Sequence, residues 1–305
     1  MNAQSMRSKI ALLMLTVTLV ACPTTGGTTS PQPPGPAQPG QPPGQGQIGN
    51  PGYGGTMVYD AGAVIYRLDV ASGRAVTIAQ SCSATPDSYP DLLRSGEVAV
   101  RCGSSDIVVY KADGTTSLTL RPPDGLLSGG PKFSEDGQKI AYRSGEYPQY
   151  PVKVVTRDGA LLARFPNAYA PSWLPDGRLA MLGADGVYVS DATLTEVSRI
   201  PRDGIVNPDD LAVSPGGDRI AFVLNAHVWG MNLDGSGLKQ LSVSGTTESG
   251  PVWSPDGSGL AIVVDNNIGG VDPIQVRKVD SADGYKNLLT NTGSIVITNS
   301  VPSWK

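Results

Sequence analysis

The chain has 305 residues with 23 lysines and arginines, 27 aspartates and glutamates and one histidine, which gives a net charge of −4. Its 38 glycines and 26 prolines argue against a mainly helical protein, because these residues cost about 1 and 3 kcal/mol in a helix interior. The acidic balance argues against a nucleic-acid partner, which requires a basic face.

The N-terminus has the pattern of a targeting segment. Arg7 and Lys9 precede a mainly apolar stretch over residues 10–21, which is too short to cross a bilayer as a helix. Its last residues and Cys22 read Leu-Val-Ala-Cys, which resembles the lipobox of bacterial lipoproteins. The resemblance implies cleavage before Cys22, a lipid anchor on Cys22 and a place in the bacterial cell envelope, facing the periplasm or the cell surface. An ordinary secretory signal is the alternative.

A tether follows the predicted lipid anchor. Residues 23–55 hold nine prolines and ten glycines, and no charged residue lies between Lys9 and Asp60. Such a segment has too few apolar groups to offset the entropy of ordering its backbone. We therefore expect a disordered, partly extended tether up to residue 55.

The rest of the chain contains a repeat with a period of about 40 residues. Its apolar anchors are Phe133, Trp173, Val213 and Trp253, and a weaker copy lies around residues 90–99. After each anchor, a Pro-Asp-Gly or related turn leads into a second apolar strand, and the glycine allows the positive φ of a tight turn. Four antiparallel strands in every 40 residues are typical of propeller blades.

The strands of the complete units are predicted from the apolar runs between turns. Second strands are expected over 139–144, 219–224 and 259–265, third strands over 152–157, 187–191, 228–233 and 275–280, and fourth strands over 161–165, 238–242 and 286–290.

The two ends of this region predict how the ring closes. Three strands at its start lack a first strand, and residues 301–305 match the opening of the repeat and then stop. The C-terminal strand is therefore expected to become the inner strand of the first blade, which removes a free sheet edge. The prediction is an all-β fold, a six-bladed β-propeller of four-stranded antiparallel blades. The three strands at the start of the region, which lack a first strand, are 57–59, 64–69 and 75–79.

The repeat Pro-x-Trp-Ser-Pro-Asp-Gly-x-x-(Ile/Leu)-Ala resembles the propeller repeats of the TolB family. The resemblance implies a periplasmic propeller that binds an envelope lipoprotein. A lipidated tether replaces the α/β domain that precedes the TolB propeller, so a Tol–Pal role stays open. The predicted organisation is a signal peptide (1–21), the lipidated tether (22–55) and the propeller (56–305).

Two cysteines remain after Cys22, and they could form a disulfide. Cys82 and Cys102 are an even pair in a protein expected outside the cytoplasm, where disulfides persist. Closing a loop of about 20 residues stabilises a fold by roughly 3 kcal/mol in the entropic model. Two free thiols are the alternative.

The sequence gives little support for catalysis or for a cofactor. His227 has no Gly-x-Ser-x-Gly nucleophile motif to serve, so we expect no enzyme, with a hydrolase or lyase propeller as the remaining alternative. Asp136, Asp176 and Asp256 belong to turns, where an aspartate caps its own backbone. Asp209, Asp210 and Glu248 lie in loops near the predicted axial channel, where a cation is an alternative to simple solvation.

One face of the predicted ring gathers tyrosines and polar loop residues. Tyrosine is favoured at interfaces because it combines a large apolar area with a polar hydroxyl. We therefore expect a monomeric scaffold that binds another envelope protein there, with a small ligand, glycan or metal ion in the axial channel as the alternative. The candidate residues are Tyr89, Tyr147, Tyr150, Tyr169, Asp209, Asp210, His227, Asn266 and Asn267.

Overall fold

The computed structural model describes residues 50, 52–61, 64–80, 89–122, 127–145, 148–242, 245–265, 272–281, 284–290, 293–294, 296–297 and 301–305. The predicted signal peptide, Cys22, almost all of the tether, Cys82, Tyr147, Asn266 and Asn267 lie outside these residues.

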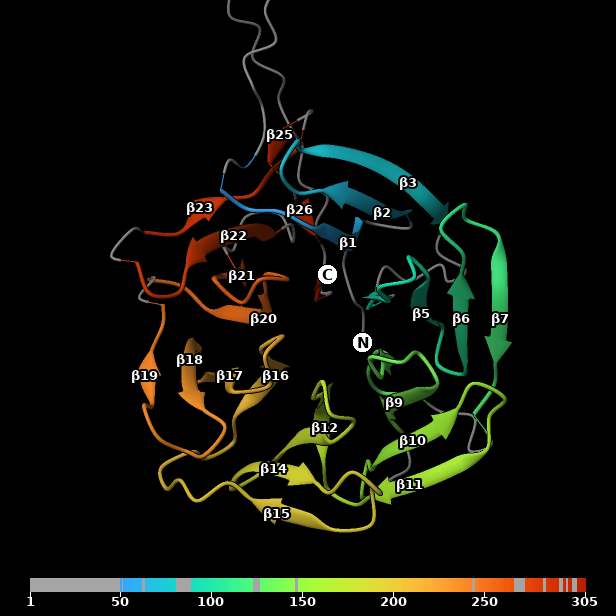
Figure 1. The fold of residues 1–305 in the computed structure, drawn as a ribbon, viewed down its shortest axis with the longest axis vertical. Helices are drawn as coiled ribbons and strands as arrows, with labels where there is room; N and C mark the ends of the chain where they lie inside the picture. The colour runs from blue at the N-terminus through green and yellow to red at the C-terminus, as the bar shows by residue number, and fades with distance from the viewer. Residues whose placement is uncertain are drawn as a thin grey trace, which may run out of the picture. The chain divides into compact units, whose positions relative to one another are not determined.

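Six antiparallel sheets stand around one axis as the blades of a propeller, and each has four strands in order from the axis outward (Figure 1). Blades 2, 3 and 4 follow one another along the chain, and in each the first strand is innermost. Their strands are β4 (Asp91–Leu92), β5 (Val98–Cys102), β6 (Asp106–Tyr110) and β7 (Thr116–Leu120); β8 (Lys132–Phe133), β9 (Lys139–Arg143), β10 (Val152–Thr156) and β11 (Leu161–Phe165); and β12 (Tyr169–Trp173), β13 (Leu179–Gly183), β14 (Gly186–Ser190) and β15 (Val197–Arg199).

Blades 5 and 6 repeat this arrangement, and blade 6 carries short additional strands. Blade 5 contains β16 (Asp209–Val213), β17 (Arg219–Leu224), β18 (His227–Asn232) and β19 (Lys239–Gln240). Blade 6 contains β20 (Glu248–Trp253), β21 (Gly259–Val264), β22 (Asp272–Lys278) and β23 (Lys286–Asn287), with β24 (Leu289–Thr290), β25 (Gly293–Ser294) and β26 (Val296–Ile297) beside it.

Blade 1 joins the two ends of the propeller, which confirms the predicted closure. Its order is β27 (Ser303–Trp304), β1 (Thr56–Ala61), β2 (Val64–Asp69) and β3 (Arg74–Gln80), so the C-terminal strand is the innermost. Beyond the paired strands, Thr56 N donates to the carbonyl of Lys305 (2.7 Å) and Lys305 N donates to that of Thr56 (2.9 Å). The inner edge of β1 is therefore covered.

The turns after the inner strands have the predicted chemistry. Gly137, Gly177, Gly217 and Gly257 have φ between 68° and 86°, which favours glycine. The aspartate before the glycine caps the turn, since Asp136 Oδ1 accepts the N–H of residue 138 at 3.0 Å. The same bond recurs at Asp176 and Asp256.

The outermost strands of blades 5 and 6 are shorter than predicted. β19 has two residues where 238–242 was expected, and the segment 286–290 divides into β23 and β24. Leu241 and Leu288 are buried at the points where pairing stops, and each donates its N–H to a carbonyl of the third strand. An outermost strand has one neighbour only, so burial of these leucines decides its course.

Most of the apolar core lies between neighbouring blades. Leu182 of β13 and Phe222 of β17 belong to one buried cluster that joins blades 4 and 5. The anchor indoles add polar links between blades, because Trp173 Nε1 donates to the carbonyl of Lys132 (2.9 Å) and Trp253 Nε1 donates to that of Ala212 (3.1 Å).

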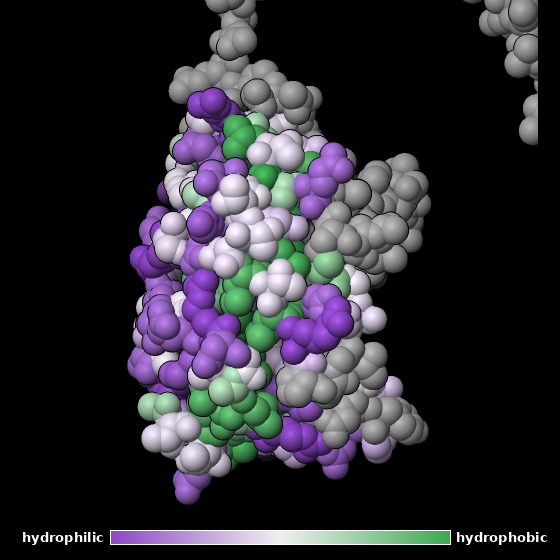
Figure 2. Space-filling model, turned by 90° about the vertical axis from the view of Figure 1, so that its right-hand side faces the viewer, coloured by the Kyte–Doolittle hydropathy of each residue, from purple (hydrophilic) through white to green (hydrophobic). Residues whose placement is uncertain are grey.

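The outer rim of the ring carries apolar side chains between hydrophilic ones (Figure 2). Val76 on β3 and Leu161 and Leu162 on β11 are exposed there. Scattered apolar groups of this kind are normal on a soluble surface.

Candidate functional site

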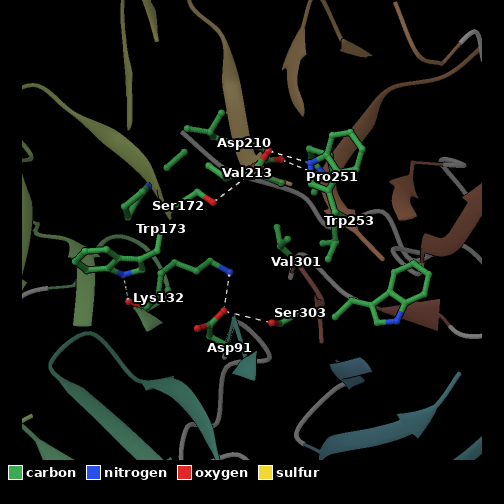
Figure 3. A pocket seen from close by; sticks show the side chains of 18 of the residues that line it. Asp91, Lys132, Ser172, Trp173, Asp210, Val213, Pro251, Trp253, Val301 and Ser303 are labelled. Atoms are coloured by element: carbon green, nitrogen blue, oxygen red, sulfur yellow. Dashed lines mark hydrogen bonds and ion pairs between the residues drawn. The ribbon is translucent and has the colours of Figure 1, made fainter. Parts of the chain in front are cut away.

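The inner strands of all six blades surround a cavity of about 420 Å³ on the ring axis, the axial cavity (Figure 3). The repeat places the residue before the anchor of each blade in its wall. These six residues are Asp91, Lys132, Ser172, Ala212, Val252 and Ser303.

Side-chain oxygens at this repeat position tie one inner strand to the next. Each accepts the N–H of the anchor residue in the following blade, which satisfies a backbone donor that has no partner within its own sheet. The bonds are Leu92 N to Ser303 Oγ (3.1 Å), Phe133 N to Asp91 Oδ2 (2.8 Å) and Val213 N to Ser172 Oγ (3.1 Å).

Asp91, Lys132 and Asp210 are among the ionisable side chains that line the axial cavity. Lys132 extends into it and places Nζ 3.5 Å from Asp91 Oδ1 (Figure 3). Asp210 Oδ2 accepts the N–H of Gly250 at 2.7 Å. Burial raises the pKa of the Asp210 carboxyl and the Asp209 carboxylate raises it further, against the Gly250 N–H and the Lys132 ammonium.

The backbone that carries Asp210 has an unusual conformation. Ala170, Asp210 and Gly250 are spaced by 40 residues, lie at irregularities of β12, β16 and β20, and have φ of 46°, 41° and 56°. An extra residue in a strand bends it and re-aims a side chain. In blade 5 this places the Asp210 carboxylate against the equivalent N–H, that of Gly250, in blade 6.

The two ends of the axial cavity differ in chemistry. We call the end with the Pro-Asp-Gly turns the lower end. Glu135 lies there between Arg94, which it contacts as an ion pair, and Lys305, whose Nζ is 3.3 Å from Glu135 Oε2. Burial opposes ionisation of Glu135, but these two cations lower the pKa of its carboxyl. Prolines from the other three blades complete the lining: Pro175, Pro215 and Pro255.

The upper end carries tyrosines stacked on arginines. The Arg143 guanidinium lies 5.4 Å from the ring centre of Tyr150 and 5.5 Å from that of Tyr169, and the Arg101 guanidinium lies 4.8 Å from that of Tyr89. The Tyr169 hydroxyl donates to the carbonyl of residue 208 at 2.7 Å. Cations over aromatic faces are stabilising and hold the rings in place.

The upper end of blades 5 and 6 contains the one histidine. Glu248, with 1% of its side chain exposed, accepts the N–H of Val228 (3.1 Å) and the hydroxyl of Ser242, all through Oε2. His227, 31% exposed, has Nδ1 at 3.5 Å from the same oxygen. The Ser242 hydroxyl thus points to a carboxylate and not to the imidazole, which is the wrong order for a nucleophile activated by histidine.

No family model and no curated protein matches this sequence. Solved structures do resemble its fold. The match with a putative TolB from Agrobacterium tumefaciens covers 83% of this chain and 98% of that protein, with a TM-score of 0.61 and 15% identity. The match with TolB from Acinetobacter baumannii covers 82% of this chain and 66% of that protein, with a TM-score of 0.64 and 15% identity. The chain has the TolB-like propeller fold.

One further solved structure of similar fold is a chain of a nidogen/laminin complex, with a TM-score of 0.60, 13% identity and coverage of 82% of this chain and 98% of that chain. At such identities the TolB-like propeller is shared as a fold. Function has to be argued from the site.

The TolB-like propeller brings most of the predicted site residues to the upper end. Tyr89, Tyr169, Asp209 and Asp210 line the axial cavity, and Tyr150 stacks on a residue that lines it. His227 lies farther out beside Glu248, and Tyr147, Asn266 and Asn267 lie outside the described residues. Asp209, Asp210 and Glu248 were expected in loops but belong to strands: Asp209 and Asp210 open β16 and Glu248 opens β20, because pairing with β17 and β21 continues beyond each irregularity.

Other predictions meet only part of the described chain. Cys102 ends β5 and Cys82 lies outside the described residues, so the disulfide stays a prediction. Within the described ranges no group of three His, Cys, Asp or Glu residues could hold a metal ion. No helix in the same ranges is long and apolar enough to cross a membrane.

Sequence reasoning missed the two arginines of the upper end. Arg101 and Arg143 lie at or next to the last position of the second strands of blades 2 and 3, each after a run of apolar or aromatic residues. They are 42 residues apart, at matching positions of adjacent repeats. A charged residue at the same place in two repeats was the available signal, and alignment of the second strands would have found it.

Proposed function

We propose that this TolB-like propeller is a lipid-anchored scaffold of the bacterial cell envelope that binds another envelope protein at its upper end, without catalysis. One observation carries the proposal: Tyr89, Tyr169 and Arg143 line the axial cavity, and they stack with Arg101 and Tyr150 at its upper end. Tyrosine and arginine are among the residues most enriched at the energetic centres of protein interfaces.

The preorganisation of these side chains supports binding of a large partner. Tyr150 and Tyr169 both stack on Arg143, so each ring has a fixed neighbour before any partner arrives. Binding then orders fewer side chains and loses less entropy. The Tyr150 side chain, 36% exposed, offers an open apolar face. A solved structure of similar fold is part of a nidogen/laminin complex, which is consistent with protein binding by such a propeller.

The lipid anchor rests on the lipobox-like sequence that ends at Cys22. Its test is Cys22→Ser, which removes the acylated thiol and should release the protein from the membrane fraction into the soluble one. A variant that stays in the membrane fraction contradicts the anchor.

The binding face is tested by retention of proteins from detergent-solubilised envelopes. A partner should be held by the wild-type protein and lost by Tyr150→Ser combined with Arg143→Ser. The control is Leu161→Ser with Leu162→Ser, two exposed residues of the outer rim. A partner that the upper-end variant retains, or that the rim variant also loses, contradicts the face.

A second candidate function is supported by the axial cavity itself. Its volume of about 420 Å³ suits a small ligand or glycan, and Asp91, Lys132 and Asp210 provide convergent polar groups. A small-molecule or glycan hit that Lys132→Met abolishes, without a protein partner, favours this function over the scaffold.

A further inference from the structure

A second cavity, of about 530 Å³, opens beside the axial cavity where blades 5 and 6 meet at the upper end. We call it the side cavity. Asp209 and Asp210 line both cavities, and Glu248 lines the side cavity from β20. Among the described residues of its lining there is no lysine, arginine or histidine. Three carboxylates thus line a space to which the lining itself adds no positive charge. His227, with Nδ1 3.5 Å from Glu248 Oε2, and Lys132, whose charge lowers the pKa of Asp210, lie outside this lining.

Glu248 has one carboxylate oxygen in use and one without a partner. Oε2 accepts from Val228 N and from the Ser242 hydroxyl, whereas Oε1 is buried and makes no hydrogen bond with any described residue. The side chain is 1% exposed, so solvent does not compensate for the missing bond. Buried polar atoms are almost always hydrogen-bonded, and an acceptor left open beside a cavity indicates a donor that enters the cavity.

The shape of the side cavity favours an organic cation over a metal ion. No three acidic or histidine side chains of the described chain converge on one point, as a divalent ion requires, and the volume greatly exceeds that of an ion. Val206 and Val223 give the lining an apolar part, while Asn207 and Thr247 add polar side chains. An alkyl stem that ends in nitrogen donors matches both parts, because lysine and arginine bury their stems and direct the charge to acceptors.

We propose that the side cavity binds an alkylammonium or alkylguanidinium group, presented by a lysine or arginine side chain of the partner protein. The source of the group rests on the proposed function, whereas the chemistry of the cavity does not. Asp209 provides the outer carboxylate at the entrance, since it is exposed, and Glu248 accepts from the same group at depth.

The test is a titration of the full chain with agmatine, a guanidinium on a four-carbon stem, followed by calorimetry or NMR. N-butylurea, of similar shape but neutral, is the control ligand. We expect saturable agmatine binding, at least tenfold weaker in Asp209→Asn and in Glu248→Gln, and none with butylurea. Asp209→Asn is the main variant, because an exposed substitution keeps the fold if Glu248→Gln does not. Asp203→Asn, which removes an exposed carboxylate of the segment before β16, should bind as wild type does.

The proposal is overturned if agmatine does not saturate, if butylurea binds equally, or if Asp209→Asn leaves the affinity unchanged. It is also overturned if calcium chloride binds at the side cavity and agmatine does not compete. A competition experiment tells whether the cationic group belongs to the partner protein or to a free small molecule. Agmatine that displaces the captured partner supports a basic side chain of the partner, and agmatine that binds without displacing it overturns that source. A partner lost through Tyr150→Ser while agmatine never binds refutes the side cavity alone and leaves the proposed function standing.

Discussion

Replacement of Trp304 by alanine should measure how much the C-terminal strand contributes to the fold. The side chain is 4% exposed and packs in a buried cluster with Met57 and Tyr59 of β1. Its Nε1 donates to the carbonyl of Gly54 at 2.9 Å, and its ring centre lies 6.2 Å from that of Tyr53. Trp304 thus connects the last residues of the chain with the first residues of the propeller.

The magnitude follows from burial. Removing a buried tryptophan costs about 3–5 kcal/mol, a range that includes the cavity it leaves. A protein of this size loses about 2–4 °C of melting temperature per kcal/mol. Trp304→Ala should therefore lower the melting temperature by roughly 6–20 °C. The loss of about 3–5 kcal/mol is a large share of a typical total stability of about 5–15 kcal/mol.

The assay is thermal unfolding followed by circular dichroism, with urea unfolding for the free energy. Trp253→Ala is the matched control, because Trp253 is also 4% exposed and donates its indole N–H to a carbonyl at 3.1 Å. Both variants should lose similar stability. Deletion of residues 301–305 should lose more, because it also removes the backbone pairing with β1.

Two results would refute the reasoning. A Trp304→Ala protein that melts within about 2 °C of wild type would show that the indole adds little. A deletion of 301–305 that is no less stable than Trp304→Ala would show that the pairing of β27 with β1 does not hold the ring closed.

Gly55→Ala should destabilise by several times more than Gly52→Ala in urea unfolding, because both have φ of 91° but a Cβ at Gly55 would lie 2.5 Å from Pro255 and 2.7 Å from the carbonyl of Lys305, whereas that at Gly52 meets nothing within 4 Å; equal losses would contradict this. Burial raises the pKa of Tyr59 from 10.0 to about 12, so its neutral phenol favours the folded state and stability should fall between these pH values. Urea midpoints at pH 9 and pH 11 should fall less in Tyr59→Phe than in wild type, and identical slopes would contradict the assignment. The Asp191 carboxyl has a lowered pKa because Thr193 and the N–H of Glu196 donate to it, so the stability it contributes is present above the unfolded pKa of about 4 and is lost as pH falls through the lower folded value. Stability should fall less steeply with decreasing pH in Asp191→Asn than in wild type, and an equally steep fall argues against this role of Asp191. A thiol count on unfolded, unreduced Cys22→Ser protein should find none, and two free thiols reject the Cys82–Cys102 disulfide.

The fold could be predicted because its signals are local and repeat. The turn after the inner strand has a glycine with positive φ in four copies 40 residues apart, and an aspartate caps three of these turns, so the copies mark four blades. The closure of the ring followed from one incomplete unit at each end. The outermost strands were predicted less well, since Leu241 and Leu288 leave the strand to be buried, and this depends on neighbours from other strands.

The site could be predicted only in outline. The repeat indicated which loops share an end of the ring, so Tyr89, Tyr150 and Tyr169 were expected together. Its alignment could mark the two arginines but not their stacking on the tyrosines, because the contact of Arg143 with Tyr169 joins the second strand of blade 3 to the first strand of blade 4. The open oxygen of Glu248 depends on the position of three separate segments and has no local signal.

The position of β1 decides how the protein would respond to mechanical force. The chain enters β1 at Thr56, at the lower end beside Lys305, and runs toward the upper end. In the proposed arrangement, a membrane anchor would pull first on Asn50, which is held by hydrogen bonds to the carbonyls of Val70 and Ala71, and then on Thr56 from below, while a partner pulled from above. The force would then act along β1, so its six residue pairs with β2 would resist together, in shear, rather than open one after another. Tension between membrane and partner would thus meet the propeller in its stronger direction.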